Sequence, residues 1–385
     1  MSHILVLNCG SSSVKFTLIN PNNSESVLTG LAESIGSKDC RIAFKSSEKI
    51  NIKIPNGQYI DVFNELKSFL ECGDYIGMIS GVGHRVVHGG RFFSGSAVID
   101  ESVLMKIEEC ILLAPLHNPA NIEGIIFCQS IFKDTPQVAV FDTAFHQTIP
   151  NYISEYAIPR NLTDEYHIKK YGFHGTSHQY VSQQAAKILK KDTGNFIVAH
   201  LGNGCSVAAV VDGKSMDTSM GLGPLDGLIM GTRSGCIDPS VFEYIQKNVG
   251  KDIHETTSML NKESGLLGIC GHSDMREIGG LANNGDEMAI LAIKMFSHRV
   301  AKFISSYMIY FQDIDGLIFT GGIGENSSEI REQIVYELNG LGFVMDINKN
   351  SDRSATFINQ TNTKNIMVIA TDEELMIAKD TQALI

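Results

Sequence analysis

The chain has 385 residues, of which 43% are hydrophobic, and its formal net charge is −12 at neutral pH. This length exceeds what one ordinary core needs and therefore predicts two domains. The acidic balance, without any long basic run, excludes a nucleic-acid-binding surface, because clustered Lys and Arg hold phosphate backbones.

The first residues, MSHILVLNCGSSS, differ from a signal peptide because they lack a basic opening and a polar stretch interrupts the apolar run. No apolar segment reaches the roughly 18 residues that a membrane-spanning helix needs. The eight cysteines include no C-x-x-C pair, which is typical of reduced thiols. We therefore expect a cytoplasmic protein that does not bind a membrane.

Two β-hairpins with polar or glycine-containing turns are predicted, one in each half of the chain. In the first, strands are predicted over 4–8 and 14–19, joined by the turn 9–13. In the second, strands are predicted over 196–201 and 205–211, and Asp212-Gly213 closes the unit with a strong turn signal. The repeated plan indicates an ancient duplication.

A third glycine-rich unit combines a predicted strand over 316–320, the glycines of 321–324 and a helix that ends near Leu338. Asn326 is predicted to cap this helix, with Glu329 at the capping-box position. Its looser counterpart in the first half is a strand over 76–80 followed by Gly81-Val82-Gly83. In the last predicted helix, Thr371 and Glu374 form a second capping box.

Strands that alternate with helices predict an α/β fold. The pattern breaks at Thr148-Ile149-Pro150-Asn151, where we place the domain boundary. This gives an N-terminal domain over 1–147, completed by the C-terminal helix 371–385, and a C-terminal domain over 148–370. A chain that returns to its first domain predicts a cleft between the two halves.

The glycine-rich turns at strand ends suit phosphate, because backbone N–H groups can approach a ligand where no Cβ intervenes. The first turn adds hydroxyls and Lys15, which can hold a β- or γ-phosphate; a solvated hairpin tip is the alternative. Neither G-x-x-x-x-G-K-[ST] nor G-x-G-x-x-G is present, which disfavours P-loop ATPases and Rossmann dehydrogenases. The turns together predict a nucleotide held between domains.

Two arginines stand in glycine-flanked segments, Arg85 in GHRVVHGG and Arg233 in GTRSG. A planar guanidinium matches the oxygens of carboxylate and phosphate. Either arginine alone is more typical of a structural ion pair. Two of them on an acidic protein predict a pair that clamps one anion.

Asp142 follows a predicted strand over 138–141, where an aspartate can bind metal, orient a nucleophile or form a salt bridge. His174 and His178 are four residues apart, a spacing that zinc ligands also use. No Glu lies between them and Gly175 weakens a helix there. Structural histidines, or hydrogen-bond donors to a transition state, are therefore the favoured interpretations.

Taken together, these segments resemble the acetate kinase (acetokinase) family of the acetate and sugar kinase/heat-shock chaperone/actin superfamily. The resemblance runs from Asn8 to Glu374 through NCGSSSVK, GHRVVHGG, APLHNP, VFDTAFHQTIP, YGFHGTSH, HLGNG, MGTRSG, FTGGIGENS and ATDEEL. It implies two duplicated ribonuclease H-like (actin-like ATPase) domains with the active site in the cleft between them, usually in a homodimer. It also implies reversible transfer of the ATP γ-phosphoryl group to acetate, giving acetyl phosphate and ADP, with Mg²⁺ or alternatively Mn²⁺.

The resemblance further implies roles for individual residues. The catalytic residues would be Asp142, Arg85, His174 and Arg233, with Arg85 also binding substrate and with His174 and Arg233 stabilising the transition state. The magnesium-site residues would be Asn8 and Glu373. The acetyl-methyl pocket would comprise Val87, Leu116, Phe173 and Pro224. The ATP- and phosphate-contacting positions would be Ser11, Ser13, Lys15, His200, Leu201, Gly202, Asn203, Gly204, Asp274, Met275, Arg276, Gly322, Ile323, Gly324, Glu325 and Asn326.

The chemistry is consistent with these roles, because acetate is ionised at neutral pH and needs no strong general base. The difficulty lies in bringing an anion to a polyanion, so positioning and charge neutralisation are expected to dominate. Asp142 is expected to orient Arg85 or Arg233, or to arrange the metal, and not to remove a proton. We expect direct in-line transfer without a phospho-enzyme.

Two alternatives remain open. The first is a kinase for propionate or another short acid, whose relatives tend to carry a smaller residue at Val87. The second is a non-catalytic ATP-binding module, as in the actin and chaperone branches. The sequence also departs from the family pattern at Cys9, Cys205 and Cys236. Cys236 lies where an aspartate is frequent, which puts in doubt any carboxylate that helps to fix Arg233.

Overall fold

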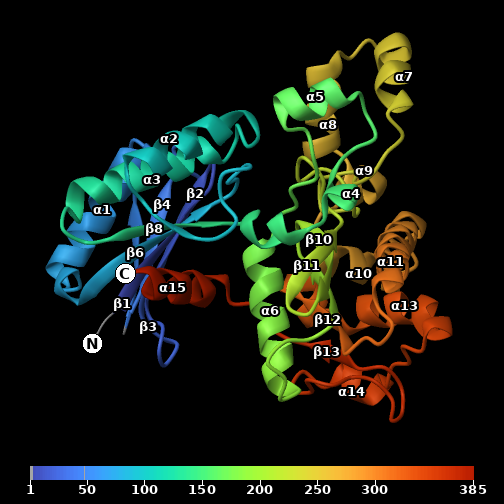
Figure 1. Cartoon of the computed structure of the whole chain (residues 1–385). Helices are drawn as coiled ribbons and strands as arrows, with labels where there is room; N and C mark the ends of the chain where they lie inside the picture. The colour runs from blue at the N-terminus through green and yellow to red at the C-terminus, as the bar shows by residue number, and fades with distance from the viewer. Residues whose placement is uncertain (1–2, 47) are drawn as a thin grey trace. The chain divides into compact units, whose positions relative to one another are not determined.

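The computed structural model describes residues 3–46 and 48–385. The chain divides into two compact units (Figure 1). The first unit holds the described residues up to Gln147 together with Asp372–Ile385, and the second holds Thr148–Thr371. Among the helices of the described residues, none combines the length and apolar content that crossing a membrane requires.

The sheet of the first unit has the strand order β5-β4-β3-β2-β1-β6-β8-β7. Its antiparallel part comprises β1 (His3–Cys9), β2 (Ser13–Asn20), β3 (Glu25–Glu33), β4 (Arg41–Lys45) and β5 (Lys49–Lys53). Its other part comprises β6 (Ile79–Val86) and β8 (Gln137–Phe141), parallel to β1, and the short antiparallel β7 (Ala97–Val98).

Helices cover both faces of this sheet (Figure 1). On one face lie α1 (Tyr59–Cys72) and α3 (Asn118–Ile131), with α2 (Glu101–Glu109) packed on α3. On the other face lies α15 (Glu373–Leu384), the last helix of the chain, in contact with β1, β6 and β8.

The sheet of the second unit has the strand order β11-β10-β9-β12-β13. Its strands are β9 (Phe196–Leu201), β10 (Cys205–Val211), β11 (Lys214–Thr218), β12 (Gly316–Thr320) and β13 (Ile366–Val368). Its helices are α4 (Asn151–Ser154), α5 (Arg160–Tyr166), α6 (Gly175–Ile188), α7 (Ser240–Val249), α8 (Ile253–Lys262), α9 (Gly265–Cys270), α10 (Met275–Asn283), α11 (Glu287–Tyr307), α12 (Gly321–Asn326), α13 (Ser328–Leu338) and α14 (Ile347–Ser351).

The two units share one strand plan. The order β3-β2-β1-β6-β8 in the first unit corresponds to β11-β10-β9-β12-β13 in the second. In each, a hairpin supplies the antiparallel strands, and two later strands add in parallel beside the first strand. The predicted α/β class with duplicated ribonuclease H-like domains is therefore confirmed.

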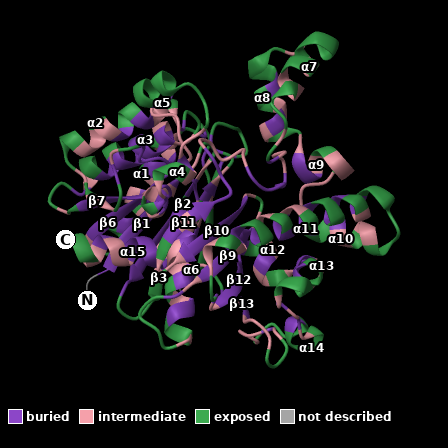
Figure 2. Ribbon diagram, turned by 45° about the vertical axis from the view of Figure 1, so that its right-hand side comes forward, coloured by how far each residue is buried: buried purple, intermediate pink, exposed green. Residues whose placement is uncertain are grey.

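The central strands are buried on both faces (Figure 2). β9, β10 and β12 are made up mostly of buried Val, Ile, Leu, Phe and Ala residues, as strands with both faces covered require. In the first unit, Phe16 of β2 and Phe63 of α1 belong to one apolar core. This packing fixes the strand ends, which carry the polar residues described below.

Several elements predicted from the sequence are confirmed to the residue. The strands over 196–201, 205–211 and 316–320 have the predicted bounds, and α13 ends at Leu338. The first hairpin also forms as predicted, with β1 and β2 each slightly longer.

Both predicted capping boxes are wrong. Ser327, and not Asn326, caps α13, because Asn326 ends the separate short helix α12, which already begins at Gly321. Asp372, and not Thr371, caps α15, where its side chain accepts from the Leu375 N–H. In each case a residue that also caps helices well lies one position later in the chain.

The predicted strand over 76–80 is also wrong, since 76–78 form a 3₁₀ turn and β6 begins at Ile79. Gly81 and Gly83 do not form a turn but lie within β6. A Cβ on Gly83 would come within 2.5 Å of Thr381 Oγ1 and 2.7 Å of Ile377 Cγ2 in α15. These glycines therefore let α15 approach the sheet closely.

Replacing Gly83 with alanine tests this packing. We expect Gly83→Ala to lower the free energy of unfolding by about 1–3 kcal/mol, the usual cost of overpacking a core. Gly77→Ala is the matched control, because a Cβ there would meet no atom within 4 Å. Chemical denaturation of both variants is the measurement, and equal stability of the two would contradict the close approach.

Candidate active site

Arg85 and Asp142 form the centre of the polar group in the first unit. Arg85 lies near the end of β6 and Asp142 directly follows β8, and these neighbouring parallel strands end at the same edge of the sheet. The Asp142 carboxylate accepts from Arg85 Nη2 at 2.6 Å and from Nε at 3.0 Å. Asp142 is almost fully buried, so this ion pair is fixed in place.

Arg85 keeps donors for a second anion. A guanidinium has five N–H groups, and Asp142 and Asn8 together engage three of them. Asn8 Oδ1, near the end of β1, accepts from Nη1 at 3.3 Å. Burial lowers the pKa of Arg85, but the Asp142 carboxylate and the nearby Glu373 and Glu374 raise it by more. The pKa of Arg85 therefore lies above its ordinary value, and the group stays charged.

Carboxylates outnumber cations around Arg85. Asp142, Glu373 and Glu374 face Arg85 and Lys15, and Lys15 forms an ion pair with Glu374. Burial, with help from Asp142 and Glu374, raises the pKa of Glu373 above its ordinary value. The protein therefore leaves negative charge there incompletely compensated, which suits a divalent cation.

The oxygen donors of this cluster fit Mg²⁺, which takes hard oxygen ligands and usually binds through one or two protein groups, water and substrate phosphates. Asn8 supplies an amide oxygen and Glu373 a carboxylate. Within the described residues, no group of three or more His, Cys, Asp or Glu side chains is arranged to hold a metal. A magnesium ion shared with nucleotide phosphates does not require such a group.

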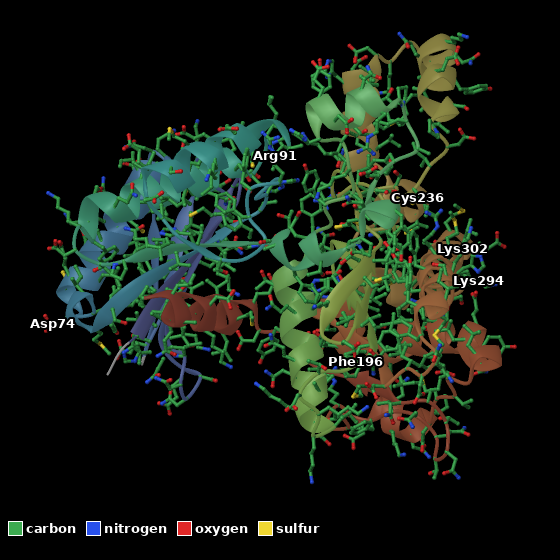
Figure 3. The ribbon with its side chains drawn as sticks, in the orientation of Figure 1. Asp74, Arg91, Phe196, Cys236, Lys294 and Lys302 are labelled. Carbon is green, nitrogen blue, oxygen red and sulfur yellow. The ribbon has the colours of Figure 1, made fainter. Side chains whose placement is uncertain are left out.

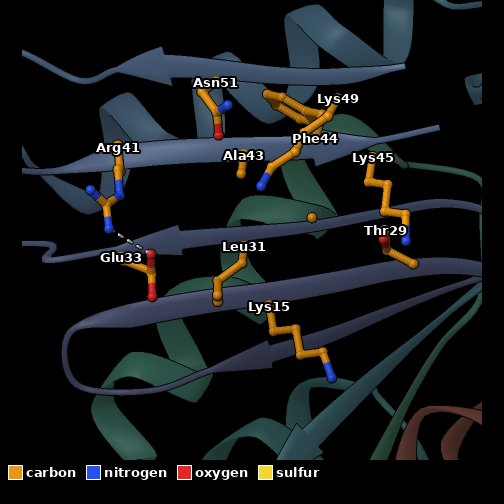
Figure 4. A pocket seen from close by; sticks show the side chains of 11 residues that line it. Lys15, Thr29, Leu31, Glu33, Arg41, Ala43, Phe44, Lys45, Lys49 and Asn51 are labelled. Carbon is orange, nitrogen blue, oxygen red and sulfur yellow. Dashed lines mark hydrogen bonds and ion pairs between the residues drawn. The ribbon is translucent and has the colours of Figure 1, made fainter. Parts of the chain in front are cut away.

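The turn between β1 and β2 carries the predicted phosphate-contacting Ser11, Ser13 and Lys15. The Gly10 N–H donates to the Ser13 carbonyl and closes the turn, leaving Ser11 exposed. Lys15 projects from β2, and it lines a hollow over the strands β2–β5 with Leu31 and Lys45 (Figure 4). Of the predicted site residues, Lys15 alone belongs to the described lining of that hollow.

Val87 and His88 follow β6 directly, and each is held by one asparagine of α3. The Val87 N–H donates to Asn121 Oδ1 at 3.0 Å, and Asn121 Nδ2 donates to the Cys9 carbonyl at 2.6 Å. Asn118 bonds both the N–H and the carbonyl of the next residue, His88. These asparagines were not predicted as site residues, although APLHNP contains Asn118. Leu116, also predicted for the methyl pocket, is mostly exposed.

In the second unit, His174 starts α6 in a left-handed conformation, with φ 57°. Its Nδ1 lies 3.0 Å from Ser206 Oγ, and His178 Nε2 lies 2.7 Å from the same oxygen. The His174 and His200 rings lie 4.4 Å apart between centroids. Ser206 therefore joins the two histidines whose spacing was noted in the sequence.

Arg233 lies close to His174. A Cβ built on Gly204 would be 3.4 Å from His174 Nε2 and 3.8 Å from Arg233 Nη1, so both groups face this glycine. Arg233 Nη1 donates to the Pro224 carbonyl at 3.3 Å. Within the described chain, no carboxylate forms an ion pair with Arg233, and burial lowers its pKa.

A pocket of about 920 Å³ lies within the second unit. Half of the predicted ATP- and phosphate-contacting residues line it: Gly202, Asn203, Asp274, Met275, Arg276, Gly322, Ile323 and Asn326. The sequence did not predict its other lining residues as nucleotide contacts: Ser273, Gly279, Gly280, Asn283, Ser327, Glu329 and Arg353. The sequence did not point to Gly279 and Gly280 of α10, because a glycine within a helix ordinarily indicates only a lower helix propensity.

Two features suit this pocket to a nucleotide. The N-termini of α10 and α13 both open onto it, and helix N-termini favour phosphate through their unpaired N–H groups. A Cβ on Gly280 or Gly322 would meet no atom within 4 Å, so these glycines border open space. Asp274 caps α10 and pairs with Arg276, which lowers the pKa of Asp274 to about 2.

Several other predicted ATP-contacting residues lie outside the described lining of this pocket. His200 Nδ1 lies 2.8 Å from Ser177 Oγ. Leu201 is the last residue of β9, and Gly204 lies in the turn between β9 and β10. Glu325 Oε1 accepts from the N–H groups of Gly321 at 2.9 Å and Thr371 at 3.2 Å. Direct contact of these residues with ATP stays a prediction.

Comparison with known proteins now identifies the family. The acetokinase family matches residues 3–379. The chain belongs to the acetokinase family.

Similar proteins of this family carry two substrate names. A curated protein named acetate kinase, from Francisella tularensis subsp. holarctica (strain OSU18), is 64% identical over 386 residues, covering 100% of both chains. A solved structure described as a propionate kinase, from Francisella tularensis subsp. tularensis SCHU S4, is 65% identical, with a TM-score of 0.98 over 100% of both chains. Porphyromonas gingivalis acetate kinase is 38% identical, with a TM-score of 0.94 over 100% of both chains. The predicted resemblance to the acetokinase family is confirmed.

Narrowing the pocket without a clash tests its role in this acetokinase. We expect Gly280→Leu to fold normally and to weaken ATP binding by about tenfold, because the side chain occupies the open space of the pocket. Gly340→Leu is the matched control, since a Cβ there also meets nothing within 4 Å and the residue does not line the pocket. Calorimetric titration with ATP is the measurement, and equal affinity in both variants would contradict the assignment.

Proposed function

We propose that this acetokinase transfers the γ-phosphoryl group of ATP to acetate, reversibly, giving acetyl phosphate and ADP. The enzyme class rests on family membership, which confirms the predicted phosphotransferase with a carboxyl group as acceptor. The observation that carries the proposal is the pair of arginines, one in each unit: a carboxylate holds Arg85, whereas no carboxylate among the described residues forms an ion pair with Arg233.

Arg85 is suited to bind the carboxylate of the acceptor. Asp142 fixes the orientation of the guanidinium through two N–H groups and leaves N–H groups on its outer nitrogens. Two parallel N–H···O bonds to a carboxylate are strong and directional. Since Asp142 is committed to Arg85, it acts by positioning, and acetate requires no base to attack phosphorus.

Arg233 and His174 are suited to stabilise the transferring phosphoryl group. Both face Gly204, and no carboxylate in the part of the chain that the structure describes forms an ion pair with Arg233. Charge on the equatorial oxygens is the main thing that an enzyme can stabilise in phosphoryl transfer. Transfer is then direct and in line, and a phosphorylated side chain formed at the rate of turnover would contradict it.

Mg²⁺ is the proposed metal, held by Asn8 and Glu373 together with nucleotide phosphates. When bound, it neutralises phosphate charge. The excess of carboxylates around Arg85 supports this choice. The homodimer and the cytoplasmic location stay predictions.

A hydroxamate assay with acetate, ATP and Mg²⁺ tests the function. We expect acetyl hydroxamate to accumulate only when all three are present. ATP binding without acyl phosphate would instead support the non-catalytic ATP-binding module.

Propionate is the second candidate substrate, because a structure with 65% identity is described as a propionate kinase. Val87 makes acetate the preferred proposal. This residue is buried and its backbone is fixed by Asn121, so its side chain cannot easily move aside for a longer acid.

Shortening Val87 tests the basis of this preference. We expect Val87→Ala to raise kcat/KM for propionate relative to acetate by about tenfold, because one methylene is worth about 1–3 kcal/mol of discrimination. Val98→Ala, an exposed valine of β7, is the matched control. An unchanged ratio of the two kcat/KM values in Val87→Ala would remove Val87 from the acid pocket.

A further inference from the structure

The loop 219–239, between β11 and α7, carries both Pro224 and Arg233 and is tied together at its base. The Cys236 thiol donates to Asp226 Oδ1, with 2.8 Å between sulfur and oxygen. The Gly227 N–H donates to the same oxygen at 2.8 Å, and the Cys236 N–H donates to the Gly227 carbonyl at 3.1 Å. We call this set of bonds the Asp226–Cys236 tie.

Arg299 of α11 anchors the tie to the body of the second unit. Its Nη1 donates to the carbonyls of Gly227 and Cys236, each at 3.2 Å. Cys236 is exposed on the surface loop that bears it (Figure 3). Although part of the residue is exposed, the sulfur is partly withdrawn from water, and this desolvation together with the Asp226 carboxylate raises the pKa of the Cys236 thiol to about 11, so the sulfur keeps its proton and remains a donor.

The loop closed by the tie contains the oxygen acceptor that the Arg233 guanidinium contacts within the described residues. This guanidinium is directed by a single bond of 3.3 Å to the Pro224 carbonyl, with Met230 Sδ at 3.8 Å as a weaker contact. Pro224 stands two residues before Asp226, and Cys236 stands three residues after Arg233. A movement at the tie therefore changes the position of Pro224 relative to Arg233.

We propose that Cys236 and Asp226 are positioning residues for phosphoryl transfer: the thiol–carboxylate bond holds the Pro224 carbonyl where it directs the Arg233 guanidinium. This inference rests on the proposed function. It also resolves the doubt raised by the sequence, because the carboxylate near Arg233 acts through a thiol and a carbonyl and leaves the guanidinium charge uncompensated. A displacement of about 1 Å in such a group can cost on the order of 100-fold in rate.

Substitutions at Cys236 distinguish the effect of its hydrogen-bond donor from the effect of its side-chain volume. We expect Cys236→Ala and Cys236→Val each to lower kcat about fivefold or more, with KM for ATP unchanged, because the nucleotide pocket does not include the tie. Cys236→Ser keeps an O–H donor and should retain at least about half of the activity. Cys72→Ala, at an exposed free cysteine in the first unit, is the control that should leave kcat unchanged.

A double-mutant cycle distinguishes positioning from a general structural role. In an Arg233→Ala background, Cys236→Ala should cause no further loss of kcat, because the group that it positions is gone. An equal fold loss in both backgrounds, or full kcat in both Cys236→Ala and Cys236→Val, would overturn the proposal. Failure of the unaltered protein to form acyl phosphate would instead reject the proposed function, and the role of Cys236 and Asp226 in phosphoryl transfer with it.

Discussion

The structure depends on one electrostatic constraint: a cation must be held rigidly beside anionic substrates without being neutralised by the protein that holds it. Arg85 and Arg233 meet this constraint in different ways. Asp142 fixes Arg85 through one edge of the guanidinium and leaves other N–H groups for a carboxylate. Arg233 is directed by a neutral carbonyl, so its charge is undiminished, although burial disfavours that charge. In the proposed function, orientation by a carboxylate suits Arg85 as the arginine that binds the ground-state acid, and orientation by a carbonyl dipole suits Arg233 as the one that meets developing charge.

The shared strand plan explains why such residues lie at strand ends. In both units a hairpin is extended by parallel strands whose ends meet at one edge of the sheet, and buried apolar residues fix those strands. Glycines serve two different purposes around this frame. Gly83 lets α15, which begins at Glu373, pack closely on β6, whereas Gly280 and Gly322 leave open the pocket that we propose for the nucleotide.

The sequence predicts the strands well because their apolar runs and glycine turns are local signals, as the bounds of β9, β10 and β12 show. Prediction from the sequence fails where two neighbouring residues are both suited to one role, as Ser327 and Asn326 are to capping a helix. It also fails where a segment distant in the sequence determines the local structure. Gly81 and Gly83 lie within β6, where their lack of a Cβ leaves room for α15, a segment distant in the sequence. The same holds for the candidate site. Residues within motifs, such as Asp142, could be predicted from the sequence. Asn121, Arg353 and the Asp226–Cys236 tie could not, because only the folded structure places them beside the other site residues.

Replacing both arginines by neutral side chains of similar reach tests the central claim most directly. With Arg85→Gln and Arg233→Gln combined, and with folding verified by calorimetry, we expect acyl phosphate formation to fall by at least about 10⁴-fold, since loss of one such donor costs about 10²–10³. Turnover close to that of the unaltered protein would show that charge neutralisation by these two guanidinium groups is not what drives the reaction.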